Sequence, residues 1–327
     1  TGLNIIDDLL FFTDGFNEPK KINVKRCFEG TNQSGLQHTQ LIVSDEDGDL
    51  TLAGDLEFGE NQNIINNDIL EKHITVLRPA PKTPPTIDID ARDLGELQFR
   101  ANDIIRVYED NSLDDNITSF KVKFLNYVSD DGEASTIPTN QIKVEIVTFT
   151  EEISINNVEW SFEVELPKPK FELKFARFGY RYKYEDGEYS AFSPFSEIAF
   201  LPGQYDYSVD KGFNLGMENL TRKINVENIV QNDLPEDVKE IELLYKESNS
   251  PNIYKVTEFK NTDKAYINNV YSIETEHIQS ILPSNQLLRV YDNVPRNALA
   301  QEVTGSRIVY ANYLQNYNFD DTINLNL

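Results

Sequence analysis

The stretch Phe175-Ala-Arg-Phe-Gly-Tyr-Arg-Tyr-Lys-Tyr-Glu185 decides the fold class predicted for this chain of 327 residues. From Ala176 to Tyr184 every second residue is apolar or aromatic, and the residues between them are mostly charged. Because successive side chains of a strand point to opposite faces, this alternation predicts a half-buried strand with an aromatic inner face. Asp186-Gly187 follows at once and favours a tight hairpin turn. The return segment, residues 189–200, holds serines and a proline, so we expect an edge strand or an irregular one.

The same alternation recurs along the chain, whereas the helical period is rare. It appears in five further segments, which are residues 122–126, 142–146, 158–166, 241–245 and 253–259. Strand-sized runs separated by turn residues every 8–12 positions are typical of antiparallel β-sandwiches. The best helix candidate is residues 274–282, which Pro283 would end, and residues 216–219 form a turn or a short helix. The sequence therefore predicts an all-β chain with very little helix.

Composition and charge exclude several classes of protein. Acidic residues outnumber basic ones by 55 to 30, a formal net charge of -25. A protein that reads a nucleic-acid sequence needs basic patches to neutralise phosphates, so the acidic surplus nearly rules out this class. No apolar run approaches the roughly 20 residues that span a bilayer, and we expect no membrane anchoring. Because the chain begins at Thr1 rather than at a methionine, we expect it to be a piece of a longer protein.

Proline-rich stretches suggest a division of the chain into five segments. Residues 78–86 hold four of the 14 prolines, and residues 166–170 form a shorter stretch of the same kind. Such stretches favour extended geometry and make stiff, solvated connectors. We therefore expect, in chain order, a β segment at 1–78, a linker at 79–86, a first β-sandwich at 87–167, a second β-sandwich at 168–290 and a returning β segment at 291–327.

Two groups of residues carry side chains that can ligate metal ions. Asp45, Asp47 and Asp49 offer hard oxygen ligands of the kind that calcium prefers, but their spacing is not that of an EF-hand loop. The flanking runs 41–43 and 50–52 instead favour a plain hairpin with its turn at 47–48. The three histidines are far apart and Cys27 is the only cysteine, so zinc is not expected.

No catalytic residue or cofactor is predicted, and we expect the protein not to be an enzyme. The sequence has no nucleophile elbow and no glycine-rich phosphate loop. Lys25 and Arg26 next to Cys27 would favour a thiolate, but a structural cysteine on a strand is the better interpretation. With 55 carboxylates available, any pair chosen as a glycosidase centre is uninformative.

Several aromatic residues are candidates for a binding surface. Trp160 and the tyrosines of 180–184 would stack on sugar rings if they were exposed, but their charged opposite faces favour a core position. Tyr205, Tyr207, Tyr313 and Tyr317 lie in turn-like contexts, and tyrosine is enriched at interfaces between subunits. The acidic surplus keeps a β protein soluble and would also repel DNA within a Debye length of about 8–10 Å. Taken alone, the surplus favours ordinary solubility over a role in repelling DNA.

Three segments together resemble a known family. The run Leu9-Leu-Phe-Phe-Thr-Asp-Gly-Phe-Asn-Glu-Pro-Lys-Lys-Ile-Asn23 is similar to the opening strand and turn of a β-propeller blade, with Phe11-Phe12-Thr13-Asp14 as its motif. Residues 294–313 resemble a segment of tail nozzle and hub proteins of short-tailed bacteriophages. Residues 179–196 are similar to the late strands of fibronectin type III-like modules. Their order looks most like the large tail muzzle or nozzle proteins of crAss-like phages.

The resemblance implies a fold, a role and a location. It implies antiparallel fibronectin- or immunoglobulin-like sandwich modules inserted between propeller-like segments at 1–78 and 291–327. It implies a structural protein of the virion tail that assembles with itself as a symmetric ring and with other tail proteins. Genomic DNA would pass through this ring without sequence-specific contacts. The alternatives are an adhesin module that binds a receptor or glycan, and an accessory domain of a polysaccharide hydrolase.

Overall fold

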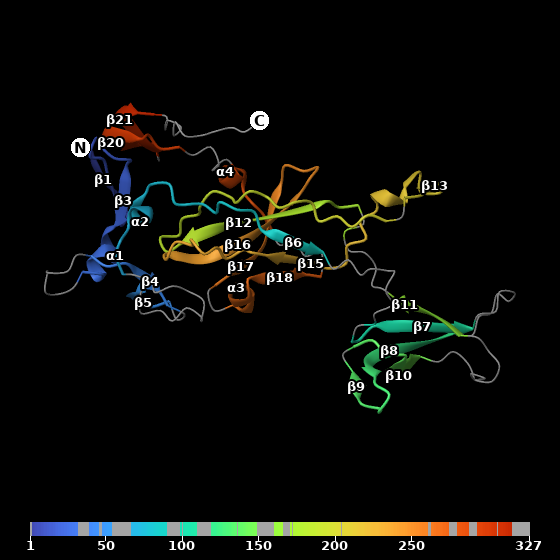
Figure 1. Ribbon diagram of the computed structural model, residues 1–327. Coiled ribbons are helices and arrows are strands. Elements are labelled where there is room, and N and C mark those ends of the chain that lie inside the picture. The colour runs from blue at the N-terminus through green and yellow to red at the C-terminus, as the bar shows by residue number, and fades with distance from the viewer. Residues whose placement is uncertain are drawn as a thin grey trace, which may run out of the picture. The chain divides into compact units, whose positions relative to one another are not determined.

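The computed structural model divides the chain into two compact units, one of Thr1–Asp90 with Lys170–Leu327 and one of Ala91–Pro169 (Figure 1). The all-β prediction is confirmed, because antiparallel sheets dominate and every helix is short. The residues that the structure describes are 2–31, 39–45, 48–53, 67–89, 99, 101–109, 119–135, 137–148, 160–165, 171, 173–203, 205–260, 263–274, 280–287, 293–305 and 307–315.

The larger unit is built around a sheet with the order β12-β16-β17-β19. Its strands are β12 (Ala176–Tyr184), β16 (Val238–Glu247), β17 (Ile253–Phe259) and β19 (Ser280–Ile281), all antiparallel. The predicted inner face of β12 is confirmed, because the five alternating side chains from Ala176 to Tyr184 are all buried in one cluster. β16 adds Ile241, Leu243 and Tyr245 to the same cluster.

A second sheet contributes to the same hydrophobic core. It has the order β18-β15-β6, with β18 at Val270–Ile273, β15 at Ile224–Glu227 and β6 at Thr86–Ile89. Ile224 and Val226 are fully buried against the aromatic face of β12, and Ile87 and Ile89 pack beside them. Residues 86–89 therefore pair within the larger unit, next to β15.

The opposite face of the central sheet is covered as well, which corrects the expectation of a half-buried strand. Leu244, Ile253 and Leu282 form a second buried cluster there, with Phe192 and Phe195 packed against it. Arg181, predicted to face solvent, is buried on this side. A strand that is covered on both faces has no solvated face, so its apolar and polar residues need not alternate strictly. This explains the sequence Ile-Glu-Leu-Leu-Tyr at residues 241–245 of β16.

The return segment 189–200 follows the edge of β12 with a period of three residues. The backbone N–H groups of Ser190, Ser193 and Ser196 donate to Tyr182, Tyr180 and Phe178 at 2.7–2.9 Å. In return, the N–H groups of those three β12 residues donate to the serine Oγ atoms at 2.9–3.0 Å. Each serine Oγ also donates to the carbonyl of the residue that follows it. The prediction of an irregular edge segment is confirmed, and we call these three rungs the serine ladder.

The smaller unit has one sheet among its described residues, with the order β10-β8-β7-β11 and β9 beside β8. Its strands are β7 (Ile104–Glu109), β8 (Ser119–Val128), β9 (Ala134–Ser135), β10 (Gln141–Thr148) and β11 (Trp160–Glu165). Ile105, Val122, Phe124 and Tyr127 form its buried core. A second layer for this unit stays a prediction.

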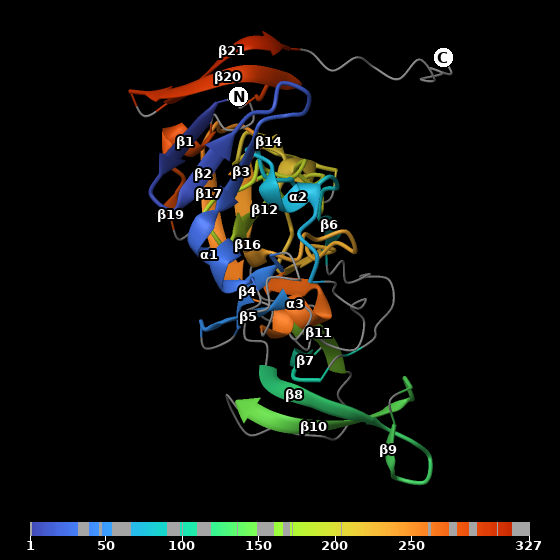
Figure 2. The ribbon, with the colours of Figure 1, turned by 90° about the vertical axis from the view of Figure 1, so that its left-hand side faces the viewer.

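The two ends of the chain form small sheets that meet. β1 (Leu3–Ile6), β2 (Leu9–Phe12) and β3 (Lys20–Asn23) pair in order, and β20 (Asn297–Thr304) pairs with β21 (Arg307–Leu314). Figures 1 and 2 both place the β20–β21 hairpin against β1. The Asn4 side chain donates to the carbonyl of Gln301 at 3.2 Å. The propeller-like identity of these ends stays a prediction.

Helices are few and short in the described part of the chain. They are α1 (Val24–Glu29), α2 (Glu71–Ile74), α3 (Lys264–Asn268), α4 (Ser284–Leu287) and the 3-10 turn η2 (Leu215–Met217), the last close to the predicted 216–219. The helix predicted at 274–282 is wrong at 280–281, which pair with β17 as β19. Residues 275–279 lie outside the described residues. Helical structure begins after Pro283 instead, because proline tolerates the start of a helix better than its interior.

The proline-rich segment, which we expected to be solvated, is solvated only in part, at Lys82–Pro84 and Thr86. Pro81 and Pro85 are buried, and the carbonyls of Pro79 and Thr83 accept hydrogen bonds from the hydroxyls of Tyr184 and Tyr180. The fixed φ angles of proline keep this segment extended, so its carbonyls can follow the tyrosines of β12.

Candidate functional site

Two of the three candidate metal residues, Asp45 and Asp49, lie at the turn of a hairpin. β4 (Ile42–Ser44) pairs with β5 (Leu50–Leu52), as the flanking runs predict. Asp45 Oδ1 accepts the N–H of Asp49 at 2.8 Å, and Gly48 takes a φ of 87°. Asp47 lies outside the described residues. Among the described residues no three His, Cys, Asp or Glu side chains gather closely enough to hold a metal ion.

Cys27 lies on helix α1 rather than on the strand that we expected. It is half-buried, and burial raises the pKa of its thiol although Arg26 opposes the effect. The nearby cavity of about 20 Å³ is lined by Cys27, Arg26 and His73 and has room for about one water molecule. These observations favour the structural interpretation of the cysteine.

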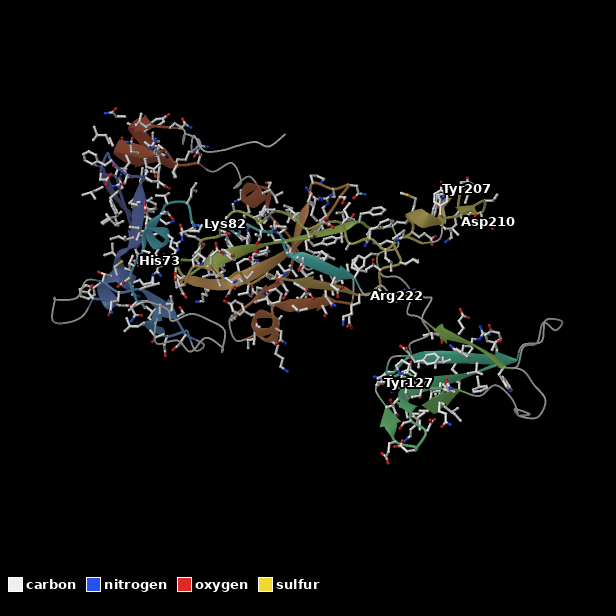
Figure 3. The ribbon with its side chains drawn as sticks, viewed as in Figure 1. His73, Lys82, Tyr127, Tyr207, Asp210 and Arg222 are labelled. Carbon is white, nitrogen blue, oxygen red and sulfur yellow. The ribbon has the colours of Figure 1, made fainter. Side chains whose placement is uncertain are left out.

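Tyr207 lies on a protruding hairpin, as Figure 3 shows for Tyr207 and Asp210, and Tyr205 comes just before this hairpin in the chain. The hairpin consists of β13 (Tyr207–Ser208) and β14 (Phe213–Asn214). Tyr205 is 93% exposed and Tyr207 is 61% exposed. Their role at an interface stays a prediction, but both rings are accessible to a partner.

Tyr313 lies on β21, at the other end of the larger unit from β13 (Figure 1). It is about half exposed, and Val309 and Leu314 of the same strand are exposed to a similar degree. The predicted surface tyrosines are therefore split between two distant places. Tyr317 lies outside the described residues.

The chain ends expose a further apolar surface that the sequence did not single out. Leu3 and Ile5 point to the same side of β1, and each is 68% exposed. The opposite side of β1 contacts β20 through Asn4. We define the terminal surface as the exposed apolar residues of β1, β20 and β21, namely Leu3, Ile5, Leu299, Val309, Tyr313 and Leu314.

The Phe11-Phe12-Thr13-Asp14 motif ends in a capped turn. Asp14 Oδ1 accepts the N–H groups of Phe16 and Asn17, each at 2.8 Å. The hydrogen bonds from Asn17 and Phe16 lower the pKa of Asp14 to about 2. Thr13 is buried, and its hydroxyl donates to the carbonyl of Leu299 at 3.4 Å. The motif thus shapes the turn between β2 and β3 and touches β20.

Basic residues between positions 21 and 78 form ion pairs with carboxylates at one end of the central sheet. We call this the acidic end, and it consists of Asp186, Glu188, Glu236 and Asp237. Lys21 Nζ donates to Glu188 at 2.5 Å and to the carbonyl of Val76 at 2.8 Å. Arg26 pairs with Asp186 at 2.7 Å. Arg78 pairs with Asp237, and both side chains are buried. Sequence reasoning missed these pairs, because the partners lie more than 150 residues apart in the chain.

His73 lies at this acidic end, beside Glu236. His73 is buried, its Nδ1 accepts the N–H of Leu70 at 3.0 Å, and its Nε2 lies 2.8 Å from Glu236. Lys72 pairs with the same carboxylate at 2.6 Å. Burial alone would raise the pKa of Glu236, but the hydrogen bonds from His73 and Lys72 outweigh it and lower the pKa to about 2.

The lowered pKa of Glu236 predicts an acid-sensitive contribution to stability. A carboxylate with an ordinary pKa of 4.5 and a folded pKa of about 2 stabilises the fold above pH 4.5 and loses that effect as the pH falls toward 2. Glu236→Gln should therefore lower stability at neutral pH, and the gap from wild type should close between pH 4.5 and 2. Urea unfolding at stepped pH measures this. Exposed Glu302→Gln is the control, and parallel curves for Glu236→Gln and wild type would contradict the prediction.

A buried ion-pair network lies on the covered face of the central sheet. Arg181 donates through Nε to Glu242 at 2.7 Å and through Nη2 to Gln286 at 2.9 Å. Its guanidinium lies 3.9 Å from the centroid of the Tyr189 ring. Glu242 also pairs with Lys255 at 3.0 Å. The arrangement fixes β12, β16 and β17 to one another and is structural rather than catalytic in form.

Comparison with protein-family models, with curated proteins and with solved structures returned no match. Within the described part of the chain, no helix is both long enough and apolar enough to cross a membrane.

Proposed function

We propose that this chain is a structural subunit of a bacteriophage tail, part of the nozzle or muzzle around the genome exit, and that its copies assemble into a symmetric ring. The proposal begins from the resemblance of residues 9–23, 179–196 and 294–313 to that family. The other tail proteins would be its neighbours, and DNA would pass it without sequence-specific contacts. It assigns the chain a mechanical role with no reactive centre.

The observation that carries the proposal is the meeting of the two chain ends. The first resembling segment contains Thr13 and the last contains Leu299, and these two residues are joined by a hydrogen bond. The central sheets are therefore inserted, in sequence, between two segments that lie together in space. The resemblance implies modules inserted between two such end segments, so the contact between them supports the proposal.

The terminal surface supports assembly through that base. Its exposed apolar residues lie on two neighbouring elements, β1 and the β20–β21 hairpin, which meet where Asn4 donates to the carbonyl of Gln301. A closed ring needs two different surfaces on each subunit that fit each other head to tail. Apolar strands of this kind are association sites when they are exposed.

The ring predicts a specific response to one substitution. The purified chain should sediment as a fixed multiple of 37.6 kDa. Ile5→Asp places a charge in the terminal surface and should shift the chain to a smaller species, because a buried unpaired charge is costly. Ile267→Asp is the matched control, since Ile267 on α3 is 63% exposed against 68% for Ile5. A wild-type monomer at all concentrations, or equal effects of both variants, would contradict the proposal.

A glycan-binding adhesin is the second candidate, favoured by the exposed rings of Tyr205 and Tyr207. Aromatic rings that are open to solvent can stack on sugars, and Tyr207 of β13 and Tyr205 just before it are two such rings. Binding to a host polysaccharide that is lost on replacing both tyrosines by alanine would favour this role over the passive one. A glycan array reports that binding directly.

A further inference from the structure

Strand β10 is an edge of the sheet in the smaller unit and carries exposed apolar residues. Among described strands it pairs with β8 alone, so its other side faces no described strand. Ile142 is 38% exposed and Ile146 is 53% exposed, although both lie on the face that carries the core. An exposed apolar edge strand is a template for pairing with another chain.

The part of β10 from Gln141 to Ile146 is regular and keeps strict alternation. One register shift places the extra residue, Leu125, in β8, and the other places Val147 in β10 just beyond this part. Ile142, Val144 and Ile146 therefore share the core face, opposite Tyr127, Phe124 and Val122 of β8. Lys143 and Glu145 share the outer face.

The sequence of this part is complementary to itself. If two copies of β10 pair antiparallel about Val144, Lys143 of each copy lies opposite Glu145 of the other, and Ile142 lies opposite Ile146. Opposite charges directly across an antiparallel pair stabilise it, and like charges destabilise it. Glu145 already lies opposite Lys123 of β8, so the joined sheets would carry an alternating row of Lys123, Glu145 and the second copy's lysine. Neither Lys143 nor Glu145 has an ion-pair partner among the described residues.

The other edge of the same sheet does not have this property. β11 carries Glu163 and Glu165 on its outer face and no basic residue between Trp160 and Glu165. Two copies of β11 paired about Glu163 would oppose like charges. The charge pattern thus distinguishes β10 from β11 as a site for self-association.

We propose that β10 is a self-association edge, on which a second copy of this chain adds its own β10 antiparallel with Val144 on the twofold axis. The contact joins two copies only, so it adds to head-to-tail contacts of a ring and does not replace them. It is independent of the proposed tail function and uses residues outside the terminal surface.

A charge-reversal experiment tests the register of this contact. The full chain is studied by sedimentation velocity over a concentration series. Three variants are compared, namely Lys143→Glu, Glu145→Lys and the double variant. All of them, and the parent chain, also carry Ile5→Asp so that the terminal surface does not contribute to association. Each single variant places like charges opposite each other twice, so the dimer should weaken roughly ten- to a hundredfold. The double variant should regain the affinity of the Ile5→Asp parent chain, and a mixture of the two single variants should dimerise.

The outcomes separate this register from its rival. If β10 instead paired with β11 of the next copy in the register that sets Lys143 opposite Glu163, the double variant would stay weak. A double variant that stays weak, single variants that match the parent chain, or a parent chain that is monomeric at every concentration would each overturn the proposal. Circular dichroism of the variants checks that the sheets are intact.

A cysteine placed on the proposed axis gives a second, independent measurement. In a Cys27→Ser background, Val144→Cys should form a disulfide-linked dimer on mild oxidation, because the register places residue 144 opposite itself. Ile137→Cys, in an exposed loop before β10, is the control and should cross-link far more slowly. Equal cross-linking of the two variants would overturn the proposal.

Discussion

Replacing Arg181 by methionine is expected to lower the free energy of unfolding of the larger unit by about 3–5 kcal/mol. The side chains of Arg181 and Glu242 are each only 2% exposed, so the substitution leaves a carboxylate buried with Lys255 as its remaining cation. Removing one partner of a buried pair costs more than the pair itself contributes, because the other charge stays desolvated. Urea denaturation followed by tyrosine fluorescence and circular dichroism measures the change.

Two further variants isolate the cause of that loss. Lys82→Met removes a pair with Asp233 that lies at the surface, and it should cost less than about 1 kcal/mol. Arg181→Met combined with Glu242→Leu removes both buried charges and should recover much of the loss. If Arg181→Met lowered the free energy of unfolding no more than Lys82→Met, the result would contradict the burial of the Arg181–Glu242 pair.

Loss of the serine ladder should have an effect of similar size. Replacing Ser190, Ser193 and Ser196 together by alanine leaves three strand N–H groups without an acceptor in a buried place. Each buried N–H group without an acceptor lowers the free energy of unfolding by about 1–3 kcal/mol, so the triple variant should lose several kcal/mol of stability or fail to fold. Single variants give the graded measurement if the triple variant does not fold.

The matched control makes the same chemical change at three serines outside the buried core. Ser208, Ser250 and Ser272 are not buried, and water can replace the hydrogen bonds of their hydroxyls. Each substitution should change stability by less than about 0.5 kcal/mol. Equal losses in the two triple variants would show that the hydroxyls of the ladder do not support β12.

The strand pattern of the larger unit could be predicted from the sequence because side-chain alternation reports which residues share a face. The inner face of β12 and the bounds of β17 at 253–259 follow from that pattern. Alternation does not report what covers the other face, so the burial of Arg181 was missed. Its cover comes from Phe192 of the return segment and from Gln286 of α4, which no local pattern links to β12.

The serine ladder shows a different limit. The spacing of Ser190, Ser193 and Ser196 is visible in the sequence. A spacing of three residues does not by itself predict that these serines bond to every second residue of a neighbouring strand. The acidic end of the central sheet could not be predicted either, because its partners are distant in the chain. Of the candidate site, exposure at Tyr205 and Tyr207 agrees with their turn-like context, whereas the exposure of Leu3 and Ile5 depends on how β1 meets β20.

The measurement that tests the central proposal most directly is a reconstruction of purified phage particles by electron cryomicroscopy. The proposal predicts that this chain can be traced as a closed ring of identical subunits at the distal end of the tail, with the joined chain ends at the contacts between subunits. Its absence from purified particles, or its presence there only as isolated copies, would contradict the proposal.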